Sequence, residues 1–219
     1  MMCEVSYFQN LSSALERQSK TAPELQKAAE LIRKAILEDR LVHVFGTEQL
    51  SSALIADLFF RAGALKHIDP MLDPTLAPAH GAYRNAMCME IDNLAPCILD
   101  YYEYVDAGDP ILLIGSDAKL PMFASALQWA QNRQLKVIAM ACKNTDAIQG
   151  TDVVIPLEEC TYQGDGYMSL AAAVLEQIVA LVKADLSNVL DYVWSGEHSV
   201  DLEQSRADID QMLYRVRHL

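Results

Sequence analysis

Four residues at a single turn, Gly46, Thr47, Ser51 and Ser52, have the types and spacing of an anion-binding site. The apolar run Leu41–Phe45 before them predicts a strand, and the apolar residues after them recur at helical spacing. The free N–H groups of a first helical turn, together with the helix dipole, favour negative charge at such a place, and the two serines can add hydroxyl donors. A strand–turn–helix unit that is capped by serine and carries no ligand explains the same pattern equally well.

The composition of the chain limits its partners. The chain has 219 residues, 52% of them hydrophobic, and a formal net charge of −13. That size supports one sizeable core. The acidity argues against nucleic acid, which needs a clustered basic surface, and against an anionic membrane surface. It leaves room for a small anionic metabolite, because a local site can be positive on an acidic protein.

The cysteines indicate neither a metal site nor a disulfide framework. Five cysteines are widely spaced, with no CxxC pair and no Cys/His cluster of zinc spacing. We therefore expect no metal, no cofactor and a reducing, cytoplasmic location. The first residues lack the pattern of a signal peptide, and we expect no apolar run of the ~18 residues that a membrane span needs. Nucleotide-binding motifs such as GxGxxG are absent from the sequence.

The alternation of strand and helix patterns predicts an α/β protein. Beyond Leu41–Phe45, four further strand-like runs are separated by helical patterns: His67–Leu72, Ile111–Ile114, Lys136–Met140 and Val153–Ile155. This rhythm predicts a five-stranded parallel sheet with right-handed crossovers, and Pro70 favours an edge position for its strand. Because ligands bind beyond the carboxyl ends of parallel strands, the turns Gly46–Ser52, Gly115–Lys119 and Ala141–Thr145 should share one rim.

The ends of the chain are predicted to be helical additions to one domain, residues 1–219. Residues 1–39 form leading helices, residues 40–186 form the α/β core and residues 187–219 form a helical tail. The leading helices can cover the sheet of their own chain. The helix Met168–Ala184 is apolar over so wide an arc that it should be buried, in the core or at a subunit contact.

Several motifs resemble those of the sugar isomerase (SIS) domain family. The segment VFGT at Val44–Thr47, the serine Ser51 and LFFRAGAL at Leu58–Leu65 are similar to the first strand and helix of that domain, and the resemblance runs over most of the chain. It is strongest to stand-alone bacterial SIS proteins that are similar to phosphoheptose isomerase and have no assigned substrate. The resemblance implies a flavodoxin-like three-layer α/β sandwich, a phosphorylated sugar as ligand and a homodimer. It also implies that the leading helices pack on the partner subunit, and the choice between this and covering their own sheet stays open. It implies no single reaction, because members isomerise, cleave ethers, transfer amino groups or only sense ligands.

The resemblance makes the turn after the third strand a phosphate loop, for which the family pattern is roughly SxSGxxP. Gly115 and Asp117 stand where the two serines are expected, and Ala118 replaces the loop glycine. A carboxylate ~4 Å from a phosphate charge costs about 4 kcal/mol per charge pair at an effective dielectric of 20, whereas Ser116 and Lys119 can favour the anion. The loop is therefore either reshaped for a different ligand, such as an unphosphorylated or amino sugar, or no longer binds phosphate.

Asp73 and His80 are the candidates for proton transfer. Both lie in a segment rich in turn residues, and in SIS enzymes this segment often carries an acidic residue toward the sugar. A carboxylate near a carbonyl carbon can move a proton, and the near-neutral pKa of histidine suits the same task. The alternatives are structural: Asp73 can form a turn with Pro74, and a lone histidine before glycine is usually a loop residue.

Two functions are predicted. The first is a phosphosugar-binding protein, a sugar-phosphate isomerase that works by aldose–ketose proton transfer, with Asp73 or His80 as the acid–base group and Lys119 near the anion. The second is a non-catalytic SIS protein, a sugar-ligand sensor or structural subunit whose phosphate loop is degenerate, as Asp117 and Ala118 indicate. Both predict a small sugar or sugar phosphate as partner and a homodimer or higher homo-oligomer.

Overall fold

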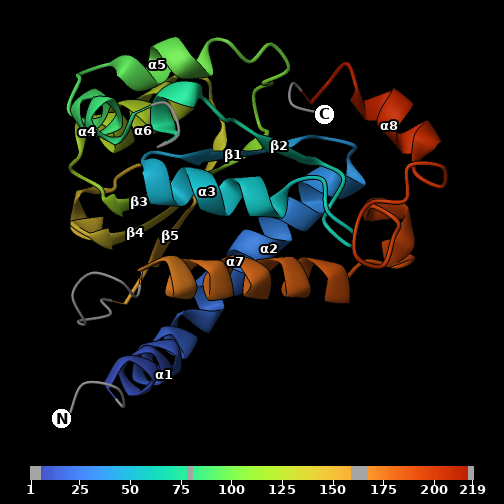
Figure 1. Cartoon of the computed structure of the whole chain (residues 1–219), viewed down its shortest axis with the longest axis horizontal. Coiled ribbons are helices and arrows are strands. Elements are labelled where there is room, and N and C mark those ends of the chain that lie inside the picture. The colour runs from blue at the N-terminus through green and yellow to red at the C-terminus, as the bar shows by residue number, and fades with distance from the viewer. Residues whose placement is uncertain (1–5, 78–80, 159–166, 217–219) are drawn as a thin grey trace.

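A computed structural model of the protein describes residues 6–77, 81–158 and 167–216. Five parallel strands form one sheet in the order β2-β1-β3-β4-β5 (Figure 1). The strands are β1 (Val42–Gly46), β2 (Ile68–Pro70), β3 (Pro110–Asp117), β4 (Lys136–Lys143) and β5 (Val153–Pro156). The predicted five-stranded parallel α/β fold is confirmed, and the strand that contains Pro70 lies at the edge of the sheet, where a missing N–H is tolerated.

Helices cover both faces of the sheet and complete a three-layer sandwich (Figure 1). One face carries α2 (Ala22–Leu37), α3 (Gln49–Leu58) and α7 (Tyr167–Ala184); the other carries α5 (Leu94–Leu99) and α6 (Pro121–Asn132), with α4 (Ala82–Met89) beside them. Strand residues alternate between the layers: Val44 and Ile114 pack with α2, α3 and α7, whereas Phe45 and Leu113 pack with α5 and α6. The strands are therefore buried on both faces, which explains their continuous apolar sequences.

The two leading helices have different positions. The second of them, α2, covers the sheet of its own chain and buries Leu25, Ile32 and Ile36 in the core. The first, α1 (Ser6–Gln18), projects away from the sheet toward the start of α7 (Figure 1). On α1 the ring of Phe8 is 75% exposed. The helix α2 therefore covers the sheet of its own chain, which is one of the two positions expected for the leading helices.

The helix α7 corrects one expectation from the sequence. It has 18 residues with a mean hydropathy of 1.5, so by length and composition alone it is long and apolar enough to cross a membrane. Its inward side instead packs in the core of this fold, where Leu170, Val174, Ile178 and Val182 are buried. Because α7 packs against both α2 and α3, it buries apolar residues over a wide arc.

The chain after α7 packs along the β2 side of the molecule. Val193 makes an antiparallel bridge with Leu65. The indole of Trp194 is buried and packs edge-on against the ring of Phe60, with 5.0 Å between the ring centroids. The last helix, α8 (Arg206–Met212), adds Met212 to the same small core. These contacts hold the tail against the segment between α3 and β2, at the end of the molecule away from α1 (Figure 1).

A buried polar cluster joins β1, β2 and the start of β3. His43 on β1 is fully buried; its Nδ1 lies 2.8 Å from Asp69 Oδ2, and its Nε2 lies 3.4 Å from Asp109 Oδ2. Arg40 Nη1 donates to Asp109 Oδ1 at 2.8 Å. Burial alone would lower the pKa of His43, but the hydrogen bonds to Asp109 and Asp69 outweigh it and hold the pKa above its ordinary value. A charged imidazole therefore links two carboxylates.

The cluster predicts that protonated His43 stabilises the fold. Because its pKa is raised in the folded protein, the stabilisation is complete below the unfolded value of about 6.5 and is lost as the pH rises through the folded pKa. Urea unfolding measured from about pH 6 to 9 should show the free energy of unfolding of the wild type falling relative to that of His43→Gln.

The exposed His198 supplies the control, because His198→Gln should keep the pH dependence of the wild type. Burial lowers the pKa of His67, which therefore acts in the opposite sense, but His67 is present in all the proteins compared. Parallel pH curves for the wild type and His43→Gln would contradict a charged His43.

Candidate functional site

The two turns singled out in the sequence lie next to each other at the carboxyl edge of the sheet. Gly46, the last residue of β1, pairs in register with Ile114 of β3, and the N–H of Thr47 donates to the carbonyl of Ile114 at 2.9 Å. The turn after β4 joins the same rim, because Asp117 pairs with Lys143. The three turns thus share one edge, where parallel sheets of this kind bind ligands.

Glycine is required at the end of β1 and within β3 by close packing. A Cβ on Gly46 would lie 2.4 Å from the backbone carbon of Ser51, so only glycine lets α3 begin against the strand. A Cβ on Gly115 would lie 2.5 Å from Thr47 Oγ1 and 2.7 Å from the ring of Phe123. The hydroxyl of Thr47 is itself buried and donates to the Ile114 carbonyl at 3.2 Å. Gly46, Thr47 and Gly115 therefore hold the two turns together.

The N-terminus of α3 already has an anion, supplied by its own chain. Glu48 is the N-cap, and its carboxylate accepts from the N–H of Ser51, while the N–H of Glu48 donates to Ser51 Oγ at 3.1 Å. Ser51 Oγ donates in turn to the Glu48 carbonyl at 3.0 Å, and Ser52 Oγ donates to the Gly46 carbonyl at 3.2 Å. Both serines predicted to bind a ligand thus use their hydroxyl protons within the turn.

The same carboxylate bridges to the second turn. Ser116 Oγ donates to Glu48 Oε2 at 2.8 Å. Glu48 is only 8% exposed. Burial raises its pKa, the hydrogen bond from Ser116 lowers it in part, and the nearby charge of Asp117 raises it again, so that the pKa lies above the ordinary glutamate value. The space between the two turns is therefore occupied by a carboxyl group whose raised pKa makes its ionised form less favourable than that of an exposed glutamate.

Asp117 closes the turn after β3. Its Oδ1 accepts from the N–H of Lys119 at 2.9 Å and from Asn144 Nδ2 at 2.6 Å, and the first of these bonds is the main reason that its pKa is lowered. Lys119 is exposed, with its backbone rather than its ammonium in this contact. Ala118 is buried and does not have a positive φ, so the loop has a shape that alanine accepts. The loop is rebuilt around Asp117 rather than around serine hydroxyls.

Sequence reasoning missed Glu48 and Tyr167. Glu48 was detectable as a polar residue three positions before Ser51, the spacing of an N-cap and its N3 partner. Tyr167, the first residue of α7, has a buried hydroxyl with no hydrogen-bond partner among the described residues. Burial raises the pKa of Tyr167, and the charges of Glu48 and Cys142 raise it further. The start of α7 therefore lies at the same rim as the two turns.

Of the two predicted catalytic residues, Asp73 follows β2 at this edge of the sheet. Asp73 caps the short helix Pro74–Leu76, with its Oδ1 accepting from the N–H of Thr75 at 2.7 Å. No hydrogen bond joins Asp73 to the turns at Gly46 or Gly115 within the described part of the chain. His80 lies outside the described residues. The role of each as an acid–base group stays a prediction.

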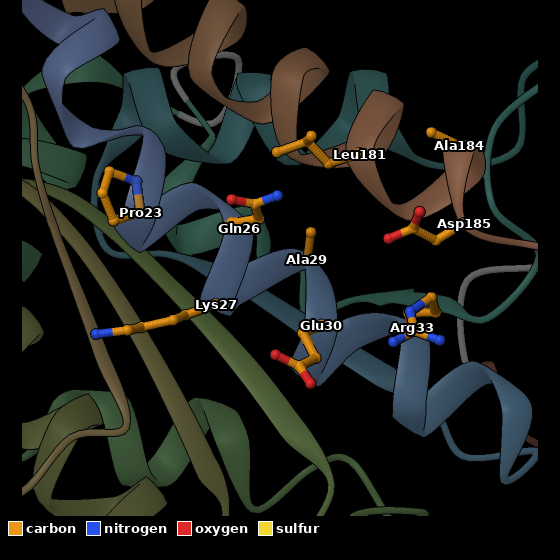
Figure 2. A pocket seen from close by; sticks show the side chains of 9 residues that line it. All are labelled: Pro23, Gln26, Lys27, Ala29, Glu30, Arg33, Leu181, Ala184 and Asp185. Atoms are coloured by element: carbon orange, nitrogen blue, oxygen red, sulfur yellow. The ribbon is translucent and has the colours of Figure 1, made fainter.

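A groove of about 460 Å³ lies elsewhere, between α2 and α7 (Figure 2). Lys27, Glu30 and Arg33 of α2 line it, together with Asp185 just after α7. None of the sequence-predicted site residues is part of its lining. Within the ranges that the structure describes, no group of three or more His, Cys, Asp or Glu side chains could hold a metal ion.

The strand order β2-β1-β3-β4-β5, with helices on both faces of the sheet, defines an α/β protein of the doubly wound class. The family model described as SIS domain matches residues 6–142, which is more than half of the chain. The chain therefore belongs to the SIS domain family. Its relatives include UPF0309 proteins of Brucella ovis and Brucella abortus, each 28% identical over 178 residues, which cover 78% of this chain and 73% of theirs.

Solved structures share the fold. A phosphoheptose isomerase from Francisella tularensis superposes with a TM-score of 0.63 at 15% identity, over 82% of this chain and 96% of that one. The NanR protein of Vibrio vulnificus, solved in complex with ManNAc-6P, gives a TM-score of 0.51 at 13% identity, over 98% of this chain and 68% of that one. At these identities the likeness concerns the fold alone.

The packing of Gly115 predicts a stability loss on adding one methyl group. Gly115→Ala should lower the free energy of unfolding by about 1–3 kcal/mol, because the new Cβ overlaps Thr47 Oγ1 and the Phe123 ring. Urea unfolding measures the loss. Introducing Thr47→Ala into the Gly115→Ala protein should recover part of it, since one of the two overlapping atoms is removed. An unchanged stability of Gly115→Ala would show that the turns are not in contact there.

Proposed function

We propose that this protein binds a sugar phosphate or a related carbohydrate derivative at the carboxyl edge of the sheet, as a ligand sensor. The observation that carries the proposal is the Glu48 carboxylate, which accepts from the first turn of α3 and from Ser116 of the next turn. These donors converge on one negative group, so the place is built to hold an anion. Membership of the SIS family and the ManNAc-6P bound to the structurally similar NanR protein support a phosphorylated sugar as that anion.

The ligand and Glu48 compete for the same donors in this proposal. A phosphate beside an ionised Glu48 would cost about 4 kcal/mol for a charge pair at ~4 Å and an effective dielectric of 20. The ligand therefore takes the place of the Glu48 carboxylate. The raised pKa of Glu48 makes this group easier to neutralise by protonation. Displacement of Glu48 changes the N-cap of α3, and this gives a sensor a structural response to its ligand.

An isomerase is the second candidate, and the environment of Glu48 favours it. An aldose–ketose isomerase needs a group that moves a proton between adjacent carbons, and a buried carboxylate with a raised pKa at the ligand edge suits that role. In this candidate Glu48 joins Asp73 and His80 as a candidate base. Interconversion of aldose and ketose phosphates by the purified protein, abolished in Glu48→Gln, distinguishes the isomerase from the sensor.

The competition predicts that neutralising Glu48 strengthens phosphosugar binding. Glu48→Gln keeps an oxygen that can accept from Ser51 and Ser116 but removes the like charge. Affinity for hexose, hexosamine or heptose phosphates should rise at least tenfold, about 1.4 kcal/mol. Thermal unfolding with each sugar at millimolar concentration finds the ligand, because a ligand at 100 times its Kd adds ~2.7 kcal/mol of stability. Calorimetric titration then gives the Kd of each protein.

Glu30→Gln is the matched control, because Glu30 is an exposed glutamate in the groove between α2 and α7 (Figure 2). It changes the net charge equally and should leave the affinity as in the wild type. A lack of stabilisation of both the wild type and Glu48→Gln by every sugar phosphate would overturn the proposed function. Equal affinities of these two proteins for a bound sugar phosphate would overturn the competition with Glu48.

We further propose that the protein is a cytoplasmic homodimer or higher homo-oligomer that pairs through α1. On this helix Phe8 is 75% and Leu15 is 38% exposed. Leu15 also lines a hollow of about 190 Å³ with Ala173 and Val174 of α7, so the apolar surface continues onto a second helix. Light scattering should give a multiple of 24.3 kDa for the wild type. The mass should fall in Phe8→Ser but not in the control Leu190→Ser, and a monomeric wild type would contradict the proposal.

A further inference from the structure

A cavity of about 320 Å³ lies on the β2 side of the molecule, away from the ligand turns. Asp69 of β2 forms part of its wall, the segment Tyr102–Tyr104 after α5 forms another part, and the segment Leu213–Arg215 after α8 completes it. Asp69 pairs in register with His43 near the start of β1, whereas the turns of the proposed sugar site follow the ends of the strands. The cavity therefore belongs to a different part of the fold.

Asp69 is the buried polar group of this cavity. It is 2% exposed, and its Oδ2 is hydrogen-bonded to His43 Nδ1. Its Oδ1 is buried and has no hydrogen-bond partner in the described part of the chain. A buried acceptor without a donor costs about 1–3 kcal/mol, and more when it is charged. The side chain shares a face of β2 with Met71, which packs in the same core cluster as Tyr102.

The other groups around the cavity leave an excess of acceptors. Arg215 is already used, because its Nη1 and Nη2 donate to Asp39 Oδ1 at 3.0 Å and to the Asp39 carbonyl at 2.5 Å. The exposed Glu103 forms no ion pair among the residues that the structure describes. The rings of Tyr104 and Tyr214 are 51% and 76% exposed at the rim. A carboxylate without a partner, a buried carboxylate oxygen and exposed aromatic faces suit a donor with positive charge.

We propose that this cavity binds a small organic cation with a primary ammonium group. The ammonium N–H groups donate to Asp69 Oδ1 and to the Glu103 carboxylate, and the apolar part of the ligand rests on Tyr104 and Tyr214. A hydroxyl in place of the ammonium would offer one donor and no charge. A quaternary ammonium would offer charge and no donor for Asp69. The site is independent of the sugar ligand proposed above.

Benzylammonium chloride is the probe, and benzyl alcohol is its neutral counterpart of similar shape. Calorimetric titration of the full chain should show benzylammonium binding at least about tenfold more tightly than the alcohol. Benzyltrimethylammonium should bind more weakly than benzylammonium, because it has no N–H group for Asp69. Glu103→Gln, which changes an exposed residue, should weaken benzylammonium binding several-fold, and Asp69→Asn should weaken it further.

Glu30→Gln serves again as the control and should bind benzylammonium as the wild type does. If Asp69→Asn does not fold, Tyr214→Leu takes its place, because Tyr214 is 76% exposed and its loss removes one wall of the cavity. Equal binding of amine and alcohol, wild-type affinity in Glu103→Gln, or no heat of binding for the amine would each overturn the proposal. None of these results would affect the sugar-phosphate titrations of Glu48→Gln.

Discussion

The first turn of a helix leaves N–H groups that need an acceptor, and in this protein the way α3 meets that need shapes the whole site. Gly46 lets the helix begin against the end of β1, because any Cβ there would strike the backbone of Ser51. The register of β1 with β3 then brings the β3 turn alongside. Glu48 is the N-cap at this point, and its carboxylate receives donors from both turns. The strand register, the glycine and the cap together place a negative charge at the carboxyl edge.

The displacement of Glu48 that we propose would couple ligand binding to local structure at small energetic cost. An N-cap contributes about 0.5–2 kcal/mol, so a ligand that displaces Glu48 changes the start of α3 without threatening the fold. The other end of the sheet is more firmly fixed, because His43 bonds to Asp69 and Asp109 in the buried cluster. In the proposed sensor, the carboxyl end of β1 would therefore respond to the ligand while the end near His43 stays in place. The charge on His43 also keeps two buried carboxylates compatible with the core.

The sequence predicted the fold more fully than the site, for physical reasons. Strands buried on both faces leave continuous apolar runs, as in Ile111–Ile114, and a proline such as Pro70 marks an edge, so the sheet could be predicted. The direction of a hydroxyl group leaves no pattern in the sequence. A serine such as Ser51 occurs at the same position whether its Oγ faces a ligand or caps its own helix. Glu48 was overlooked because a single glutamate in a turn is usually solvated. The helix α7 was predicted to within one residue, but its resemblance to a membrane span by length and composition was missed, since Glu176 divides its apolar residues into shorter runs.

The protonation state of Glu48 tests most directly whether its carboxylate occupies the anion position of the site. Carbon-13 NMR of the side-chain carboxyl carbons, followed over pH with Glu48→Gln to assign the signal, gives the pKa of Glu48 alone. We predict a pKa above the ordinary glutamate value in the free protein, and a changed signal once a sugar phosphate that binds the protein is added. A Glu48 signal that titrates like an exposed glutamate and does not respond to the bound ligand would contradict the central claim that this carboxylate occupies the anion position.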